Sequence, residues 1–254
     1  IYLWVMMTPQ MRGYVRSVGM VALIWRLILT SGTGAIFGFL VARDAYDTAI
    51  MAPLFILMSL SLGMAVFWVS TLTMCRWNGY LLSPELSGKL RRLSALFILG
   101  VLYLVALHHL TNLYMAHHQG IERFLLVDGG VYPWLFWLGF VLCGGIVPVW
   151  WFLDRRFSTP AWTVTAALMV IVGGLCHLYV TIIGGQAYPL RLVSGYRVDS
   201  GFYDGEITHY LPSLPELALG IGGVSLALLM IVVAVRILPF LPTVTGSLPG
   251  SNQG

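Results

Sequence analysis

Residues 170–190 read VIVGGLCHLYVTIIGGQAYPL, and residues 208–217, after a polar segment, read THYLPSLPEL. The first stretch is apolar enough for a membrane helix, yet it carries Gly173, His177 and Thr181. Residues four apart lie on the same face of a helix, so these three would share one side. A histidine in such a helix predicts the wall of a small-molecule site at a membrane surface.

The residues that follow predict a lid over His177. We expect the helix to end at the paired Gly184 and Gly185, because glycines commonly interrupt helices. Gln186 and Tyr188 come next. They would place a hydrogen-bonding loop directly above the histidine.

The composition is that of an integral membrane protein. Hydrophobic residues make up 58% of the chain and charged residues 9%, and the mean hydropathy is +0.85. Soluble domains carry roughly 25% charged residues.

The chain opens at Ile1, and its first apolar run, IYLWVMM, is too short to cross ~30 Å of hydrocarbon. We therefore expect a fragment that lacks its amino-terminal helices.

The cysteines exclude several kinds of redox centre within this chain. Cys75, Cys143 and Cys176 are far apart, and neither CxxC nor CxxCH occurs. This pattern predicts no iron–sulfur motif, no c-type haem attachment and no disulfide framework. Any iron–sulfur cluster would belong to a partner.

The predicted fold class is all-α, an integral membrane helical bundle of about six transmembrane helices. Each apolar segment is long enough to span a bilayer at roughly 20 residues. The predicted spans are 18–42, 50–75, 93–118, 132–153, 160–183 and 215–240. The predicted organisation is a remnant of a preceding segment at 1–17, a transmembrane domain at 18–242 and a disordered tail at 243–254.

Basic residues predict the orientation. If the six helices alternate, one side receives Arg12, Arg16, Arg76, Lys89, Arg91, Arg92, Arg155, Arg156 and Arg236. The opposite loops, 43–49, 119–131 and 184–214, mix arginines with acids such as Asp44, Asp47 and Glu122. By the positive-inside rule the first side is cytoplasmic, which also places the carboxyl terminus there.

Histidines on two helices are predicted to lie at one depth. Counting ~1.5 Å per residue from the cytoplasmic ends places His108, His109 and His177 together in the outer half of the membrane. Asn112 continues the stripe on the first of these helices. The quinone or proton-path candidates are His108, His109, Asn112, His177, Thr181, Gln186 and Tyr188.

Several functions remain open for these side chains. Histidines can simply hydrogen-bond neighbouring helices. A quinone needs donors to its carbonyls and a titratable group. A b-type cytochrome would use His108 or His109 with His177 as axial ligands. A transporter would instead place discontinuous helices around a midplane site, which fits these off-centre positions least well.

Three further polar residues receive simpler interpretations. His117 and His118 follow the predicted helix and are expected to be interfacial and solvated. Glu216 follows Ser213 at the spacing of a capping box, so it is expected to cap the last helix.

A family resemblance rests on four stretches of this sequence. They are DAYDTAIMAPLFILMSLSLGMA at 44–65, IIGGQAYPL at 182–190, FYDGEITHYLPSLPELALGIGG at 202–223 and RILPFLP at 236–242. With these the chain resembles the NrfD/PsrC-like polysulfide reductase membrane subunits, and among them the branch found in sulfite-reduction-associated complexes. The likeness covers nearly the whole chain.

The resemblance implies a non-autonomous subunit of a quinone-linked redox complex in a prokaryotic cytoplasmic membrane. Such proteins have about ten helices in two bundles, of which these six look like the last. They carry no haem or iron–sulfur cluster, bind menaquinone or ubiquinone, and exchange electrons with a periplasmic iron–sulfur subunit. Their quinone site is associated with the amino-terminal bundle. His177 and Gln186 would therefore either contact quinone from this half of the protein or, instead, transfer protons or help dock the partner. The docking candidates are Asp199, Asp204 and Glu206.

Overall fold

The computed structural model describes residues 5, 9–78, 82–189, 206–208, 210 and 212–237. Within them all regular structure is helical, and six helical spans are long and apolar enough to cross a membrane, which confirms the predicted class. The chain divides into two compact units, residues 21–209 and residues 1–20 with 210–254. The helices are η1 (Pro9–Tyr14), α2 (Val15–Gly38), α3 (Met51–Asn78), α4 (Pro84–Tyr114), α5 (Gln119–Arg123), η2 (Phe124–Asp128), α6 (Val131–Trp134), η3 (Leu135–Ile146), α7 (Val147–Leu153), η4 (Arg155–Phe157), α8 (Pro160–Tyr179), η5 (Val180–Gly184), α9 (Gly185–Ala187) and α10 (Leu214–Ile237).

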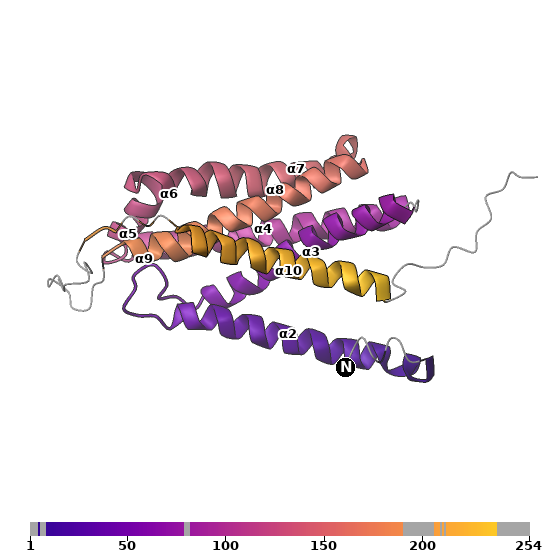
Figure 1. The fold of residues 1–254 in the computed structure, drawn as a ribbon. Coiled ribbons are helices and arrows are strands. Elements are labelled where there is room, and N and C mark those ends of the chain that lie inside the picture. The colour runs from indigo at the N-terminus through magenta and orange to yellow at the C-terminus, as the bar shows by residue number, and fades with distance from the viewer. Residues whose placement is uncertain are drawn as a thin grey trace, which may run out of the picture. The chain divides into compact units, whose positions relative to one another are not determined.

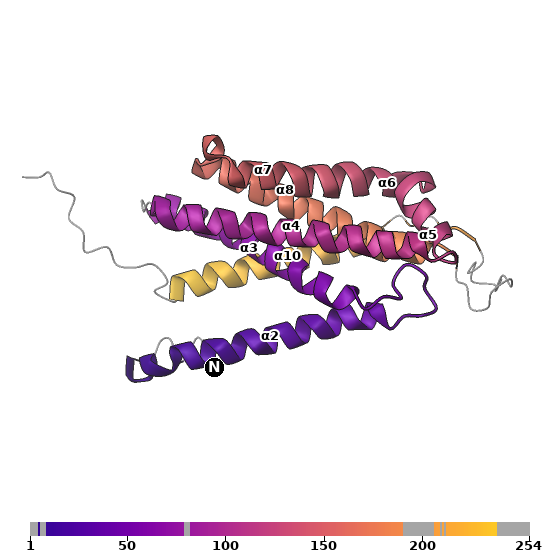
Figure 2. The same ribbon diagram turned by 180° about the vertical axis from the view of Figure 1, so that it is seen from behind.

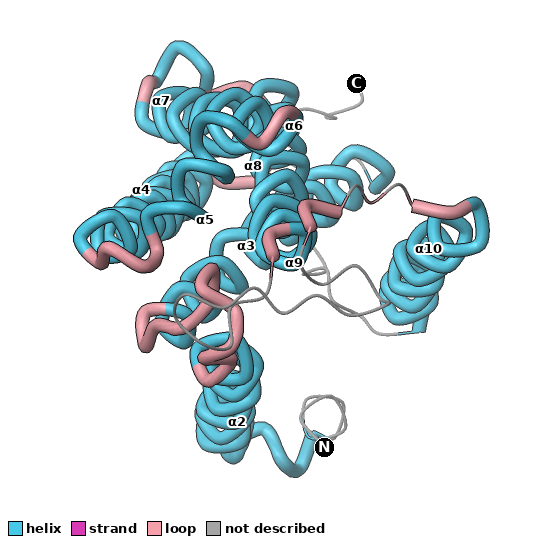
Figure 3. The backbone as a smooth tube through the Cα atoms, turned by 90° about the vertical axis from the view of Figure 1, so that its left-hand side faces the viewer, coloured by secondary structure: helices cyan, strands magenta, loops and turns pink. Residues whose placement is uncertain are grey.

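Four long helical segments form the bundle of the larger unit. Two of them are single helices, α3 and α4, and two are continuous runs, α6–η3–α7 and α8–η5–α9. They run side by side (Figures 1 and 2) and are seen nearly end-on in Figure 3. α8 packs on both η3 and α3, α3 packs on α4, and α4 packs on α7, so the contacts close into a ring. One buried cluster includes Leu54, Val105 and Phe136, and a second includes Trp68 and Phe152.

The third span begins earlier and ends earlier than predicted. We predicted residues 93–118, whereas α4 runs from Pro84 to Tyr114. The side chain of Ser83 accepts a hydrogen bond from the backbone N–H of Leu86 at 3.3 Å, and Pro84 occupies the first turn. This is the arrangement that starts a helix, so the basic residues that follow are helical.

The prediction that the fifth span stops at Gly184 and Gly185 was wrong. The helical run continues through η5 and α9 to Ala187, and both glycines are buried with helical backbone angles. A Cβ on Gly184 would lie 2.7 Å from a methyl of Leu125, and one on Gly185 would lie 2.9 Å from the hydroxyl of Tyr46. Glycine is used here for close packing against neighbouring segments, not for termination.

The backbones of η3 and α8 touch where Gly144 meets Gly173. A Cβ on Gly144 would lie 2.6 Å from Cα of Gly173, and a Cβ on Gly173 would lie 2.3 Å from Cα of Gly144. Real Cβ atoms do not approach backbone atoms so closely. Small residues at such crossings let membrane helices pack by van der Waals contact.

The smaller unit contributes α10. The backbone N–H of Ser213 donates to Oε2 of Glu216 at 2.8 Å, which confirms the capping interpretation of this carboxylate.

Of the three docking candidates, Glu206 is described, and its side chain is exposed. The docking candidates Asp199 and Asp204 and the predicted tail at 243–254 lie outside the described residues.

The Gly144–Gly173 crossing predicts the effect of a single methyl group. Gly173→Ala should lower the free energy of unfolding by about 1–3 kcal/mol, because helix backbones must separate to admit the Cβ. Gly63→Ala is the matched control, since a Cβ on Gly63 of α3 meets nothing within 4 Å. Thermal unfolding in detergent should show a lower Tm for Gly173→Ala only. Equal Tm values for the two variants would contradict the close crossing.

Candidate functional site

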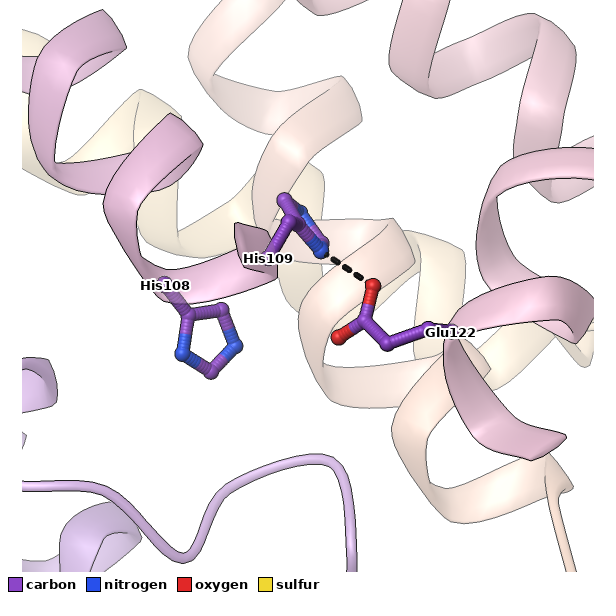
Figure 4. Close-up of side chains that lie close together, drawn as sticks. All are labelled: His108, His109 and Glu122. Atoms are coloured by element: carbon purple, nitrogen blue, oxygen red, sulfur yellow. Dashed lines mark hydrogen bonds and ion pairs between the residues drawn. The ribbon is translucent and has the colours of Figure 1, made fainter. Parts of the chain in front are cut away.

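Glu122 is a carboxylate with no exposed surface. It lies on α5, which folds back over the end of α4. Its Oε2 lies 2.6 Å from Nδ1 of His109, and its Oε1 accepts a hydrogen bond from Nδ2 of Asn112 at 2.8 Å. Figure 4 shows the His109 ring directed at the carboxylate. Burying a carboxylate costs free energy unless it has partners, and these two contacts supply them.

Asn112 joins two further histidines to this carboxylate. Its Nδ2 lies 3.3 Å from Nε2 of His108, and its Oδ1 lies 3.2 Å from Nδ1 of His118. His108, Asn112 and His118 are buried, and His109 is mostly buried. We call His108, His109, Asn112, His118 and Glu122 together the Glu122 cluster.

The prediction that His118 is solvated was wrong. Its side chain is 1% exposed, because the chain turns back after Tyr114 and directs this ring at Asn112. His117 is exposed, as predicted, and its ring centre lies 3.9 Å from that of His118. The Glu122 cluster therefore reaches the surface through two adjacent imidazoles.

The surroundings of His118 disfavour its protonated form. Burial lowers the pKa of the His118 imidazole, and the neighbouring His117 lowers it further. The carboxylates of Asp44, Asp47 and Glu122 act in the opposite direction but are the weaker influence. His118 is thus held mainly neutral near pH 7.

His177 lies beside the Glu122 cluster, as the depth argument predicted. Its ring stacks on Phe140 of η3, with centroids 4.3 Å apart and planes inclined by 22°. His108, His109, His177 and Thr181 line one cavity of about 10 Å³. A single water needs at least about 10–15 Å³, so neither a quinone ring nor a haem fits between these side chains.

Three buried imidazole nitrogens have no hydrogen-bond partner among the described residues. They are Nδ1 of His108, Nδ1 of His177 and Nε2 of His118. An unsatisfied buried polar atom typically costs about 1–3 kcal/mol. Three such atoms in one region leave places where a water molecule or a transferred proton can bind.

Gln186 and Tyr188 lie outside the residues that line this cavity. The Gln186 side chain is exposed, and Nη1 of Arg43 donates to the backbone carbonyls of both Gln186 and Tyr188 at 3.0 Å. These hydrogen bonds connect the end of α9 with the loop between α2 and α3. The two candidates therefore lie at the edge of the site, not over His177.

Irregular helix surrounds the cavity. Leu125 comes from η2, Phe136 from η3, and Val180 and Thr181 from η5, and all three of these segments are π-helical. π-helical turns are rare and often occur at functional sites. The sequence gives no simple signal for them, because their apolar residues also suit an α-helix.

A metal ion is a second possible use of part of the cluster. Nitrogens of His108 and His109 and an oxygen of Glu122 lie within 4.8 Å of one another. Such donors bind zinc and similar ions. However, both oxygens of Glu122 already have hydrogen-bond partners, so the hydrogen-bonded network accounts for the arrangement without a metal.

Comparison with known proteins identifies relatives of the chain. The family model for polysulphide reductase, NrfD, matches residues 2–189. An Hdr-like menaquinol oxidoreductase integral membrane subunit of Archaeoglobus fulgidus is 29% identical over 242 residues, which cover 92% of this chain and 60% of that protein. A putative membrane subunit of dimethyl sulfoxide reductase from Halobacterium salinarum is 28% identical over 229 residues, 83% of this chain and 50% of that protein. No solved structure matches.

Burial of His118 predicts a pH effect on stability. Its pKa is lower in the folded than in the unfolded chain, where it is about 6.5, so the unfolded state takes up the proton first as pH falls. The stabilising contribution is complete above about pH 6.5 and is lost below it. Tm should therefore fall less between about pH 7.5 and about pH 5.5 in His118→Gln than in wild type or in the exposed control His117→Gln. Equal decreases in all three would contradict the assignment.

Proposed function

We propose that this chain, which belongs to the NrfD polysulphide reductase family, is part of a quinone-interacting membrane subunit of a redox complex. The complete subunit would exchange electrons between the quinone pool and a periplasmic iron–sulfur partner. The observation that carries the proposal is the Glu122 cluster, a buried group of one carboxylate, one amide and three imidazoles at one end of the bundle. The name of the Archaeoglobus relative, a menaquinol oxidoreductase subunit, supports the same function.

The chemistry requires a route for protons. A bound quinone supplies two-electron, two-proton redox chemistry, so a subunit that serves it must accept or deliver protons. A carboxylate and an imidazole 2.6 Å apart, as in Glu122 and His109, can share a proton and pass it on. Asn112 holds His118, beside the exposed His117, close to Glu122, and His109 joins Glu122 to the cavity beside His177. An amide does not relay protons, so a proton passing between His118 and Glu122 would need a water molecule, with Asn112 orienting the two groups.

The size of the cavity supports a proton-handling role for His177 over direct contact with a quinone. With about 10 Å³ beside it, this histidine has no room for a quinone ring. We infer that His108, His109 and His177 hold or move protons and that the ring binds outside this cavity. The family resemblance, which associates quinone binding with an amino-terminal bundle, supports the same division. The chain spans only 60% and 50% of the lengths of its two relatives.

A finer proposal concerns the complex. The 44–65, 182–190 and 202–223 stretches most resemble DsrP of the sulfite-reduction-associated DsrMKJOP complex. We therefore propose a role in sulfur metabolism, in a prokaryotic cytoplasmic membrane, with the carboxyl terminus cytoplasmic and the 184–214 loop meeting the iron–sulfur partner. Copurification tests this docking side. The full-length protein should copurify with an iron–sulfur subunit, and replacing Glu206 and its loop by a glycine-serine linker should abolish the copurification.

Quinone binding tests the proposed function directly. The full-length protein in detergent should bind a menaquinone analogue in a fluorescence titration, and His177→Leu should bind it with unchanged affinity. Failure of the wild type to bind any quinone analogue would overturn the proposed function. Loss of binding in His177→Leu, with yield and Tm unchanged, would instead place the ring in this half of the protein. A sharp haem band in the reduced-minus-oxidised spectrum would favour a cytochrome.

Proton transfer through Glu122 is tested by turnover. In the assembled complex, Glu122→Gln should lower quinone-linked electron transfer on the order of 10²-fold, because general acid–base groups typically contribute at least this much. Quinone-analogue binding should be unchanged. Asp128→Asn is the matched control, since Asp128 is an exposed carboxylate paired with Arg123 at 2.6 Å.

A purely structural role for Glu122 gives a different result. A proton-transfer role predicts that Glu122→Asp recovers part of the rate and that Glu122→Gln alters the pH profile and solvent isotope effect. A structural role predicts lower Tm in both variants with an unchanged pH profile in whatever activity remains.

A further inference from the structure

A large basic pocket lies at the end of the bundle opposite the Glu122 cluster. Its volume is about 1240 Å³, and it is lined by the C-terminal part of α3, the first turns of α4 and α8, and η4. These segment ends gather at the same end of the bundle in Figure 2. Along α4, His108 follows Arg91 by 17 residues, which separates the pocket from the Glu122 cluster by about 25 Å. The pocket is therefore independent of the proposed function.

Cations dominate the charged lining. Five basic side chains line the pocket, Arg76, Lys89, Arg91, Arg92 and Arg155, against one acidic residue, Glu85. Glu85 is paired with Lys89 at 2.6 Å. In the described part of the chain, no carboxylate forms an ion pair with Arg76, Arg92 or Arg155. A pocket with this excess of positive charge fits an anionic ligand.

Arg91 gives the pocket a buried, preorganised donor. The residue is 6% exposed, and its Nη2 donates to the carbonyls of Trp151 and Asp154 at the end of α7. These bonds fix the guanidinium plane. Its Nε is buried and has no hydrogen-bond partner among the described residues. Because both protons of Nη2 are engaged, Arg91 offers the pocket a fixed positive charge and its remaining single N–H groups, which suit a phosphate oxygen.

Two helix starts add to the positive field. Residues of the first turns of α4 and α8, including Pro84 and Pro160, line the same pocket. The N-terminal end of a helix carries a partial positive charge. Two such ends beside a fixed arginine favour an anion over a neutral ligand.

The remaining walls are apolar. Trp68, Leu72 and Val164 line the pocket and belong to spans long and apolar enough to cross a membrane. A soluble anion such as phosphate would gain nothing from these walls. A ligand with a phosphate group and a hydrocarbon portion would satisfy both the cations and the apolar surface.

We propose that this pocket binds the phosphate headgroup of an anionic membrane phospholipid. The cations contact the phosphate, and the apolar walls contact the glycerol and upper acyl chains. By the positive-inside rule this end of the bundle faces the cytoplasmic leaflet, where basic pockets between helices bind anionic headgroups.

Lipid retention tests the proposal. Purified full-length protein, reconstituted with equal amounts of phosphatidylglycerol and phosphatidylcholine and released into detergent, is examined by native mass spectrometry. We expect a retained phosphatidylglycerol adduct at least 10-fold more abundant than the phosphatidylcholine adduct. The double variant Arg92→Gln/Arg155→Gln, which leaves the buried Arg91 and its helix contacts intact, should lose about 10-fold of that preference.

A matched double variant separates the pocket from general surface charge. Arg16→Gln/Arg156→Gln removes the same charge, and neither residue lines the pocket. It should retain the phosphatidylglycerol adduct. Equal loss in both double variants, or equal retention of the two lipids by wild type, would overturn the proposal. Stabilisation by inorganic phosphate equal to that by phosphatidylglycerol in thermal unfolding would also overturn it in favour of a soluble phosphate site.

Discussion

The burial of Glu122 is the constraint on which the α5 end of the bundle depends. A carboxylate without exposed surface in a low-dielectric interior is stable only when each oxygen has a partner. His109 and Asn112 meet that requirement from one face of α4, and Asn112 in turn determines where His108 and His118 lie. The turn after α4 must fold back so that α5 can present the carboxylate. One buried carboxylate thus accounts for both the early end of α4 and the burial of His118.

Close helix packing supplies the other half of the arrangement. Gly173 lies one turn before His177 on α8, and Gly144 lies one turn after Phe140 on η3. Because the two glycines let the backbones touch, the next turn of each helix brings the Phe140 and His177 rings into stacking contact at 4.3 Å. The imidazole is therefore positioned by apolar packing and not by hydrogen bonds to its Nδ1.

Hydropathy was sufficient to predict the six spans, and residue counting was sufficient to bring His108, His109 and His177 together. Hydropathy and residue counting both use information that lies within a single helix, without knowledge of its neighbours. Glu122 and His118 were missed because a loop acid and a terminal histidine look solvated until the chain folds back over α4. Gly184 and Gly185 were misinterpreted for a related reason, since only the neighbours Leu125 and Tyr46 show that these glycines serve packing.

The interior between the two ends of the bundle limits how protons could travel. Ala95, Ile98 and Ala166 are buried between the Arg91 pocket and the Glu122 cluster. Among the described residues of this bundle, the buried imidazoles and carboxylates all belong to the Glu122 cluster or to His177 beside it. A proton route needs titratable groups or water, and the described interior between them holds no buried imidazole or carboxylate and, beside Ser61 and Ile98, one cavity of about 20 Å³ with room for about one water molecule. On the proposed function, the Glu122 cluster exchanges protons with solvent at its own end, where His118 lies beside the exposed His117. Electron transfer through this subunit would then consume or release protons on one side of the membrane only, unless helices beyond the described bundle supply a second route.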